Sequence, residues 1–290
     1  MSTLIRDLEN AISHLTGQPF HSRQQHSVGG GCINEAFVLG DGEQRFFVKT
    51  NRARLHHMFV AEAEGLRALA AGMRVPEVIA DGVSGDTAWL VLEWLDMGDN
   101  PEPAAMGEAL ARVHRVTTPQ FGWHIDNTIG STPQSNTWHD DWVSFWREER
   151  LEPQFALAAR NGCRFGKDAD LLLERLPVFF HDYLPQPSLL HGDLWSGNAA
   201  GLPDGTPVIF DPACYFGDRE CDLAMTELFG GFGPRFMAAY HASWAIDPGY
   251  RVRKTLYNLY HIVNHVNLFG GGYTSQARSM LAQLLAETRG

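Results

Sequence analysis

The sequence predicts an α+β protein with two lobes, a small and mostly β lobe over residues 1–95 and a larger, mainly helical lobe over residues 96–290. Short strand-like runs fall in the first 95 residues, together with one or two periodic helices. Residues 96–103 then bring two prolines and several turn formers, which are typical of a connection between lobes. Beyond them, apolar residues recur mainly at the helical spacings of three and four.

Composition restricts the class of protein. A chain of 290 residues with 44% hydrophobic and 20% charged residues can bury a large core and is ordinary for a soluble globular protein. The net charge of −11 argues against a nucleic-acid partner, and no run approaches the ~18 apolar residues of a membrane span. The N-terminus does not resemble a signal peptide. The four cysteines are scattered without a zinc or disulfide pattern, so a cytoplasmic location is expected.

The first lobe is expected to begin with a helix over residues 4–15, which Gly17-Gln18-Pro19 ends. Three glycines, Gly29, Gly30 and Gly31, then lie between two potential strands. They predict a hairpin whose tip carries backbone amides without side-chain bulk, and such a loop can close over phosphates. A triple glycine is also common in simple flexible turns, so this feature alone does not identify a phosphate site.

A lysine and a glutamate follow the glycine loop at informative positions. The strand predicted over residues 45–49 ends on Lys49, and the helix predicted over residues 55–71 carries Glu62 on its apolar face. A buried glutamate requires a partner, and Lys49 on the adjacent strand is the obvious one. A glycine loop, a strand lysine and an inward helix glutamate, in this order, form the first half of a kinase nucleotide site.

Two further strands are predicted over residues 75–80 and 89–95. The second leads into the connection between the lobes. Backbone groups of Glu93, Trp94 and Leu95 are therefore expected to bind the edge of an adenine ring.

The second lobe is predicted to be mainly helical, with helices over residues 106–114 and 168–176. Residues 117–141 form a long polar and aromatic loop between them, too apolar for simple disorder, which we expect to be an ordered wall near a site. Trp142, Phe145 and Trp146 predict a core helix face. Near the C-terminus, His261 and His265 lie four residues apart without a third ligand, which favours a hydrogen-bonded or pocket-lining pair over a metal site.

The segment from His191 to Asn198, His-Gly-Asp-Leu-Trp-Ser-Gly-Asn, carries the chemistry. Asp193 is expected to be the catalytic base that orients a substrate hydroxyl group. Asn198 and Asp211, which ends the next apolar run, are expected to hold Mg²⁺ against the phosphates of ATP. His191 is predicted to support the loop rather than to react.

The interval after Asp211 restricts the acceptor. Only ten residues separate Asp211 from Asp222, which leaves no room for the activation segment of a protein kinase. A small acceptor or a flexible tail is therefore favoured. Asp222 can either cap its own helix or accept backbone amides from the catalytic loop, and we favour the second.

Taken together, these residues resemble the fructosamine kinase or ketosamine-3-kinase family, in the aminoglycoside phosphotransferase-like branch of the protein-kinase-like fold. The resemblance extends from the glycine loop to Gly270. Its markers are Gly-Gly-Gly-Cys-Ile at 29–33, Phe-Gly-Trp at 121–123 with Pro-Gln-x-Asn at 133–136, Trp-x-x-Phe-Trp at 142–146, His-Gly-Asp-Leu-Trp-Ser-Gly-Asn at 191–198, and Asn-His-x-Asn-x-Phe-Gly at 264–270. Trp123 is a departure, because a smaller or aliphatic residue is expected there.

The resemblance implies transfer of the γ-phosphoryl group of ATP to the 3-hydroxyl group of a ketosamine, free or protein-bound. The unstable product then eliminates and frees the amine, which is deglycation. Trp195 is expected to stack on the sugar or the ammonium group of this substrate, and Asp218 and His265 are further candidate substrate residues. Cys32, on the glycine loop, is considered for a redox-linked dimer, with a monomer as the alternative.

Three alternatives remain. The nearest is a kinase of the same fold that acts on an aminoglycoside, a choline-like alcohol or an amino acid. A non-catalytic nucleotide-binding regulator is disfavoured, because a regulator has no need of the base Asp193. A protein kinase is disfavoured by the short interval after Asp211.

Overall fold

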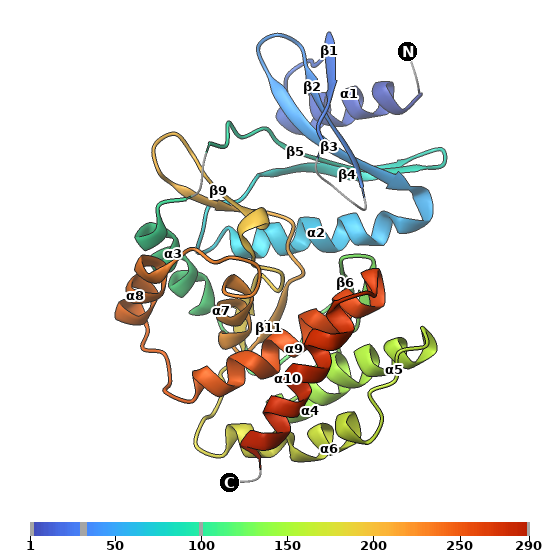
Figure 1. Ribbon diagram of the computed structural model, residues 1–290. Coiled ribbons are helices and arrows are strands. Elements are labelled where there is room, and N and C mark those ends of the chain that lie inside the picture. The colour runs from blue at the N-terminus through green and yellow to red at the C-terminus, as the bar shows by residue number, and fades with distance from the viewer. Residues whose placement is uncertain (1–2, 30–33, 99–100, 289–290) are drawn as a thin grey trace.

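The computed structural model describes residues 3–29, 34–98 and 101–288 (Figure 1). The N-terminal region contains one five-stranded antiparallel sheet and two helices. Its elements are α1 (Thr3–Thr16), β1 (Gln24–Ser27), β2 (Glu35–Gly40), β3 (Arg45–Arg52), the 3₁₀ turn η1 (Ala53–Leu55), α2 (His56–Leu69), β4 (Val78–Ser84) and β5 (Thr87–Glu93). The strand order is β1-β2-β3-β5-β4, so β3 and β5 are central.

Both faces of this sheet are covered, which the sequence of β5 explains. Alternate residues of a strand point to opposite faces. Leu90 and Leu92 pack in the cluster that contains α2, whereas Trp89 and Val91 pack in the cluster that contains α1. A central strand covered on both faces is apolar at almost every position, and burial of each large side chain contributes about 1.5–3 kcal/mol.

The remaining residues form a mainly helical region (Figure 1). Its short strands form three two-stranded pairs, β6–β7, β8–β11 and β9–β10. The elements are α3 (Pro103–His114), β6 (Asn127–Ile129), β7 (Thr132–Gln134), α4 (Trp142–Phe145), the π-helical turn η2 (Trp146–Leu151), α5 (Glu152–Arg160), α6 (Lys167–Arg175), η3 (Leu176–Phe180), β8 (Ser188–Leu190), η4 (Ser196–Asn198), β9 (Ala199–Gly201), β10 (Pro207–Ile209), β11 (Tyr215–Gly217), α7 (Glu220–Thr226), α8 (Pro234–Ser243), α9 (Tyr250–Phe269) and α10 (Tyr273–Glu287).

The two-lobe α+β architecture is as predicted, and three predicted elements differ in detail. The strands expected over residues 75–80 and 89–95 are β4 and β5, which begin at Val78 and Thr87. Pro76 lacks the N–H that a strand ladder uses, so the ladder starts after it. Residues 117–141 are not a bare loop, because they contain the β6–β7 hairpin.

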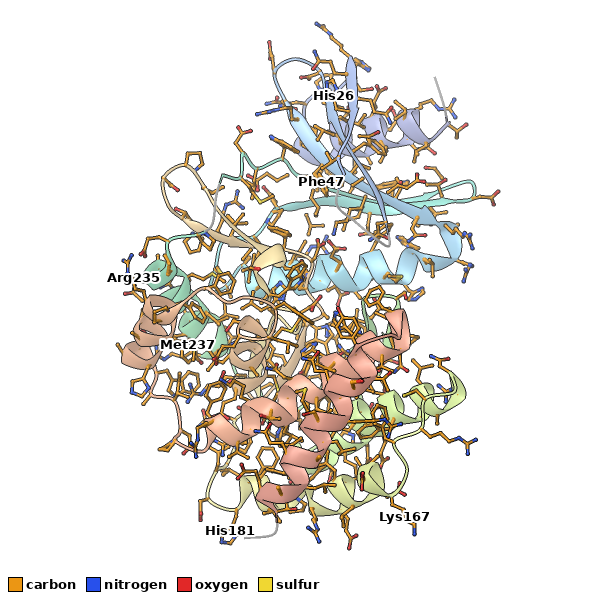
Figure 2. All side chains as sticks on the ribbon, in the orientation of Figure 1. His26, Phe47, Lys167, His181, Arg235 and Met237 are labelled. Carbon is orange, nitrogen blue, oxygen red and sulfur yellow. The ribbon has the colours of Figure 1, made fainter. Side chains whose placement is uncertain are left out.

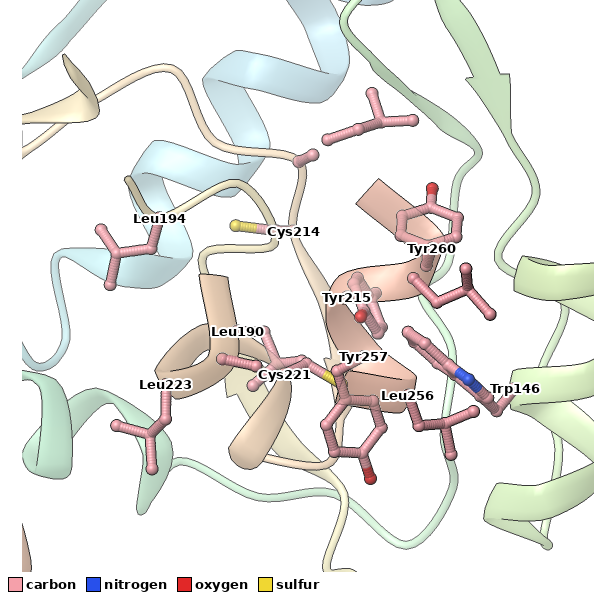
Figure 3. Close-up of a cluster of buried hydrophobic side chains, with 14 of the residues drawn as sticks. Trp146, Leu190, Leu194, Cys214, Tyr215, Cys221, Leu223, Leu256, Tyr257 and Tyr260 are labelled. Atoms are coloured by element: carbon pink, nitrogen blue, oxygen red, sulfur yellow. The ribbon is translucent and has the colours of Figure 1, made fainter. Parts of the chain in front are cut away.

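The core of the helical region is aromatic around α4, β11 and α9 (Figure 3). The rings of Trp146 and Tyr257 meet edge to face with centroids 5.0 Å apart, and Trp142 stacks on Phe145 at 5.5 Å. Trp142, Phe145 and Trp146 are all buried, as predicted for a core helix face. His26 and Phe47 lie in the sheet, whereas Lys167 and His181 lie at the opposite end of the molecule (Figure 2). Among the helices of the described ranges, none combines the length and the apolar character that crossing a membrane requires.

Candidate active site

Lys49 and Glu62 form the buried ion pair that the sequence predicts. Lys49 lies in the central strand β3, and its Nζ is 2.6 Å from Glu62 Oε1 on α2. Lys49 also pairs with Asp211, which the sequence did not indicate. Burial lowers the pKa of Lys49, but the charges of Glu62 and Asp211 outweigh burial and raise it above its ordinary value. The lysine is therefore a fixed positive charge between the sheet and the helical region.

The catalytic loop, residues 191–198, follows directly from β8. The carboxylate of Asp222 holds the backbone of this loop. Asp222 accepts hydrogen bonds from the N–H groups of His191 at 2.7 Å and Gly192 at 2.9 Å. This placement confirms the favoured role for Asp222. Burial would raise the pKa of Asp222, but its bonds with His114 and the Gly192 amide lower it below the ordinary value. Asp222 is therefore a permanent buried anion that fixes the loop.

His191 supports the loop, as expected. One ring nitrogen bonds to the Phe210 carbonyl at 2.9 Å, and the other accepts the Asp193 N–H at 3.2 Å. Burial lowers its pKa, so the ring is neutral near pH 7. Gly192 has φ +82°, and a Cβ there would lie 2.1 Å from the Ala213 carbonyl oxygen. Only glycine allows this close approach of the two loops.

Asp193 is half-buried beside Asn198, and its pKa is raised to about 7. Burial is the main cause, and the nearby charge of Asp211 adds to it. Asn198 donates from Nδ2 to the Asp193 carbonyl at 2.9 Å and to its carboxylate at 3.3 Å. A carboxylate with a pKa near neutrality can take a proton from an alcohol and release it again.

Two side chains fit a magnesium ion beside Asp193. The amide group of Asn198 is oriented by bonds from its nitrogen, which leaves its oxygen for a cation. The Asp211 side chain is 48% exposed, and the bond to Lys49 uses only one carboxylate oxygen. Mg²⁺ prefers such oxygen donors and commonly takes only one or two from the protein, with phosphates and water completing its shell.

Trp195 lies on the surface of the catalytic loop. Its side chain is 37% exposed, and the ring covers Gly197, where a Cβ would lie 2.2 Å from the indole. A partly exposed indole two residues from the base is available to a ligand.

The connection after β5 has the features expected for an adenine contact. The Glu93 carboxylate is bound to Arg74 and to the Glu77 N–H, and the Glu93 N–H donates to the Glu77 carbonyl at 2.8 Å, so neither group is left for a ligand. Trp94 donates from its indole to Asp96, and Leu95 is buried. Within residues 34–98 and 101–288, no hydrogen bond involves the Leu95 N–H. Gly29 lies at the edge of the glycine loop, whereas Gly30, Gly31 and Cys32 lie outside the described residues.

Two of the predicted substrate residues have their hydrogen-bond partners away from the catalytic loop. Asp218 is fully buried, and the hydroxyl groups of Tyr183 and Tyr257 donate to its carboxylate. This placement argues against direct substrate contact, because a carboxylate without exposed surface cannot reach an incoming ligand. His265 bonds to the His261 carbonyl at 2.7 Å and packs among Phe229, Phe269 and Tyr273, which makes it a hydrogen-bonded member of an aromatic cluster.

Sequence analysis assigned no function to the carboxamides of the hairpin, although Gln134 belongs to the Pro-Gln-x-Asn marker. Asn127 and Gln134 face each other across β6 and β7, are buried, and bond to the backbone that follows Asp211. The segment 117–141 thus lies against the site, as expected. Trp123 is packed on Phe216 at 5.4 Å and is 8% exposed, so it belongs to the core.

Comparisons with known proteins agree with this geometry. The model of the fructosamine kinase family matches residues 4–287. A protein named probable ketoamine kinase from Synechocystis is 52% identical over 279 residues, 94% of each chain. The chloroplastic protein-ribulosamine 3-kinase of Arabidopsis thaliana is 42% identical, with 89% of this chain and 82% of that protein covered.

Solved structures give the same assignment. A crystal structure from Haemophilus somnus, of a protein assigned as a fructosamine-3-kinase, superposes with a TM-score of 0.89 at 30% identity over 96% of each chain. An aminoglycoside phosphotransferase superposes with a TM-score of 0.62 at 16% identity, over 97% of this chain and 99% of the other, which shows a shared fold. This chain belongs to the fructosamine kinase family.

Proposed function

We propose that this protein transfers the γ-phosphoryl group of ATP to the 3-hydroxyl group of a ketosamine, which leads to deglycation. The observation that carries the proposal is the ion pair between Lys49 and Asp211. It joins the lysine of the sheet to Asp211, whose segment is hydrogen-bonded to the loop that carries Asp193, so phosphate-binding and proton-accepting groups lie in one site. The names of the relatives support a ketosamine as the acceptor. We place the lobe boundary at residues 96–103, and a cytoplasmic location remains part of the proposal.

The proposed reaction needs only positioning and charge. Asp193 orients the acceptor hydroxyl group and takes its proton as the oxygen–phosphorus bond forms and ADP leaves. Lys49, held by Glu62, contacts the α- and β-phosphates. Asn198 and Asp211 would hold Mg²⁺, which supplies neutralisation of phosphate charge when it is bound.

A panel of acceptors tests this function. ADP release would be measured with fructosyl-lysine, ribulosyl-lysine, an aminoglycoside and choline, each at saturating ATP and Mg²⁺. We expect turnover with the ketosamines at least 100-fold above that with the other acceptors. Faster turnover with choline or the aminoglycoside would assign the site to another acceptor class.

Trp195 is predicted to bind the acceptor by stacking. Trp195→Ala should raise the KM for the ketosamine about 2- to 30-fold, because an aromatic contact of this kind contributes ~0.5–2 kcal/mol. The KM for ATP should stay unchanged. Gly197→Ala provides a matched variant, since its Cβ would displace the indole without removing it. Steady-state kinetics that show unchanged KM and kcat in both variants would exclude the stacking role.

The raised pKa of Asp193 predicts a pH dependence. The base must be ionised, so kcat/KM should fall as the pH drops below about 7. Mg²⁺ bound at Asp211 would favour the ionised form of the Asp193 carboxylate. The pH midpoint of the acid limb should therefore be lower in the profile of kcat than in the profile of kcat/KM. Rate profiles between pH 5 and 9 measure both limbs. A kcat/KM that stays flat from pH 5 to 9, as expected for a base with the ordinary aspartate pKa of ~4, would contradict this assignment.

A further inference from the structure

We propose that Gln134 and Asn127, the two facing carboxamides of the β6–β7 hairpin, are positioning residues for Asp211. They act through the backbone carbonyls of Ala213 and Cys214, which follow Asp211 in the chain. The proposal rests on the proposed function only in that Asp211 is the magnesium-binding carboxylate. It assigns a role to the segment 117–141.

The carboxamides form a directional chain of buried hydrogen bonds. The Tyr260 hydroxyl donates to Gln134 Oε1 at 2.5 Å, and Gln134 Nε2 donates to Asn127 Oδ1 at 2.7 Å. Asn127 Nδ2 then donates to the Cys214 carbonyl at 2.8 Å, with a weaker branch from Gln134 to the Ala213 carbonyl at 3.4 Å. Cys214 and Tyr260 lie in the same part of the core (Figure 3). Because each amide donates from its nitrogen and accepts at its oxygen, these hydrogen bonds fix the orientation of both amides.

Asp211 has a backbone that needs such support. Its φ is +58°, and no other non-glycine residue of the described ranges has a positive φ. This conformation costs roughly 1–2 kcal/mol and persists where the surroundings over-determine it. The side chain is half-exposed, and its ion pair with Lys49 holds only one carboxylate oxygen. Hydrogen bonds of the neighbouring backbone are therefore needed as a second restraint.

The backbone on both sides of Asp211 is held by hydrogen bonds. Before it, the Phe210 N–H donates to the Asn198 carbonyl at 3.1 Å, and after it, the Ala213 N–H donates to the His191 carbonyl at 2.8 Å. These bonds tie Asp211 to the catalytic loop. The hairpin carboxamides donate to the carbonyl groups of Ala213 and Cys214 in the segment after Asp211. Through Tyr260 they also connect this segment to α9.

Direct contact with the substrate does not explain these amides. Gln134 is 2% exposed and Asn127 is 8% exposed, and their polar groups are used within the chain of bonds. They can act on the reaction only through the residues that they hold. A merely structural role would change stability and leave the affinity for Mg²⁺-bound nucleotide unchanged.

The test replaces Gln134 with leucine, which keeps the approximate volume and removes every hydrogen bond. Leu172→Ala is the control, because it opens a cavity at a fully buried residue of α6, a helix that packs mainly against α10 and η3. The full-length variants would be compared by melting temperature, by calorimetric Kd for ADP with and without Mg²⁺, and by steady-state kinetics.

Both variants should melt at a lower temperature than the wild type. Gln134→Leu alone should raise the Kd of ADP with Mg²⁺ at least fivefold, with the Kd of metal-free ADP within twofold of wild type. Its kcat should fall at least tenfold, with the acceptor KM within twofold. Leu172→Ala should keep all these values near wild type.

Tyr260→Phe is a second variant, needed if Gln134→Leu does not fold. It removes only the hydroxyl group that begins the chain of hydrogen bonds. It should weaken binding of ADP with Mg²⁺ at least twofold. Wild-type affinity for ADP with Mg²⁺ in Tyr260→Phe and in any folded Gln134→Leu overturns the proposal. Because this readout needs no acceptor, it is independent of whether the acceptor is a ketosamine.

Discussion

Replacing Asp193 with asparagine is expected to lower kcat by about 10²–10⁴-fold, because this range is what a positioned general base contributes. The amide has nearly the same shape and cannot take the proton of the acceptor hydroxyl group. Asn198, which donates to Asp193, would keep a partner in the variant carbonyl oxygen. Steady-state kinetics at saturating substrates measure the effect.

Nucleotide binding is the control for Asp193→Asn. Lys49, Glu62 and Asp211 are untouched, so the Kd for ADP with Mg²⁺ should stay within about threefold of wild type, or ~0.7 kcal/mol. Turnover within tenfold of wild type would remove Asp193 from the role of base.

Replacing Lys49 with methionine is expected to have the largest combined effect on stability and activity. Loss of one partner of a buried pair leaves the other charge uncompensated, which costs about 3–5 kcal/mol. Glu62 would be left buried, with its side chain 11% exposed. Because burial raises the pKa of Glu62, its ionised form destabilises the fold. The loss of unfolding free energy should therefore be greater at pH 8 than at pH 5, which chemical denaturation at the two values measures.

The double variant Lys49→Met/Glu62→Leu separates folding from nucleotide binding. An apolar pair of similar volume often replaces a buried ion pair without loss of stability. We therefore expect the double variant to recover most of the unfolding free energy and to remain without phosphoryl transfer. Recovery of activity together with stability would show that Lys49 serves only the fold.

The main residues of the candidate active site could be predicted from the sequence because they depend on local order and spacing. Strand and helix periodicity constrain Lys49 and Glu62, which form the predicted ion pair. Asp193 and Asn198 lie five residues apart in one short segment, and the structure brings their side chains together. For Asp222 the sequence left two roles open, and the structure shows the favoured one, in which its carboxylate accepts the His191 and Gly192 amides.

Polar contacts between residues far apart in the chain could not be predicted from the sequence. The chain from Tyr260 through Gln134 and Asn127 to Cys214 joins residues up to 126 positions apart, and no local pattern pairs them. Asp218 shows the converse case. It is a candidate substrate residue in the sequence, whereas in the structure two tyrosine hydroxyl groups donate to its buried carboxylate. Burial decides such cases, and burial of a single polar residue depends on the tertiary packing.

The position of the phosphate in the product shows directly whether the 3-hydroxyl group of a ketosamine is the acceptor. Ribulosyl-lysine and fructosyl-lysine would each be incubated with ATP, Mg²⁺ and the protein, and the product examined by proton–phosphorus correlation NMR before elimination proceeds. We predict a single phosphate ester coupled to the proton on carbon 3, absent with Asp193→Asn. An ester on another hydroxyl group, or no ATP-dependent ester on either ketosamine, would contradict it.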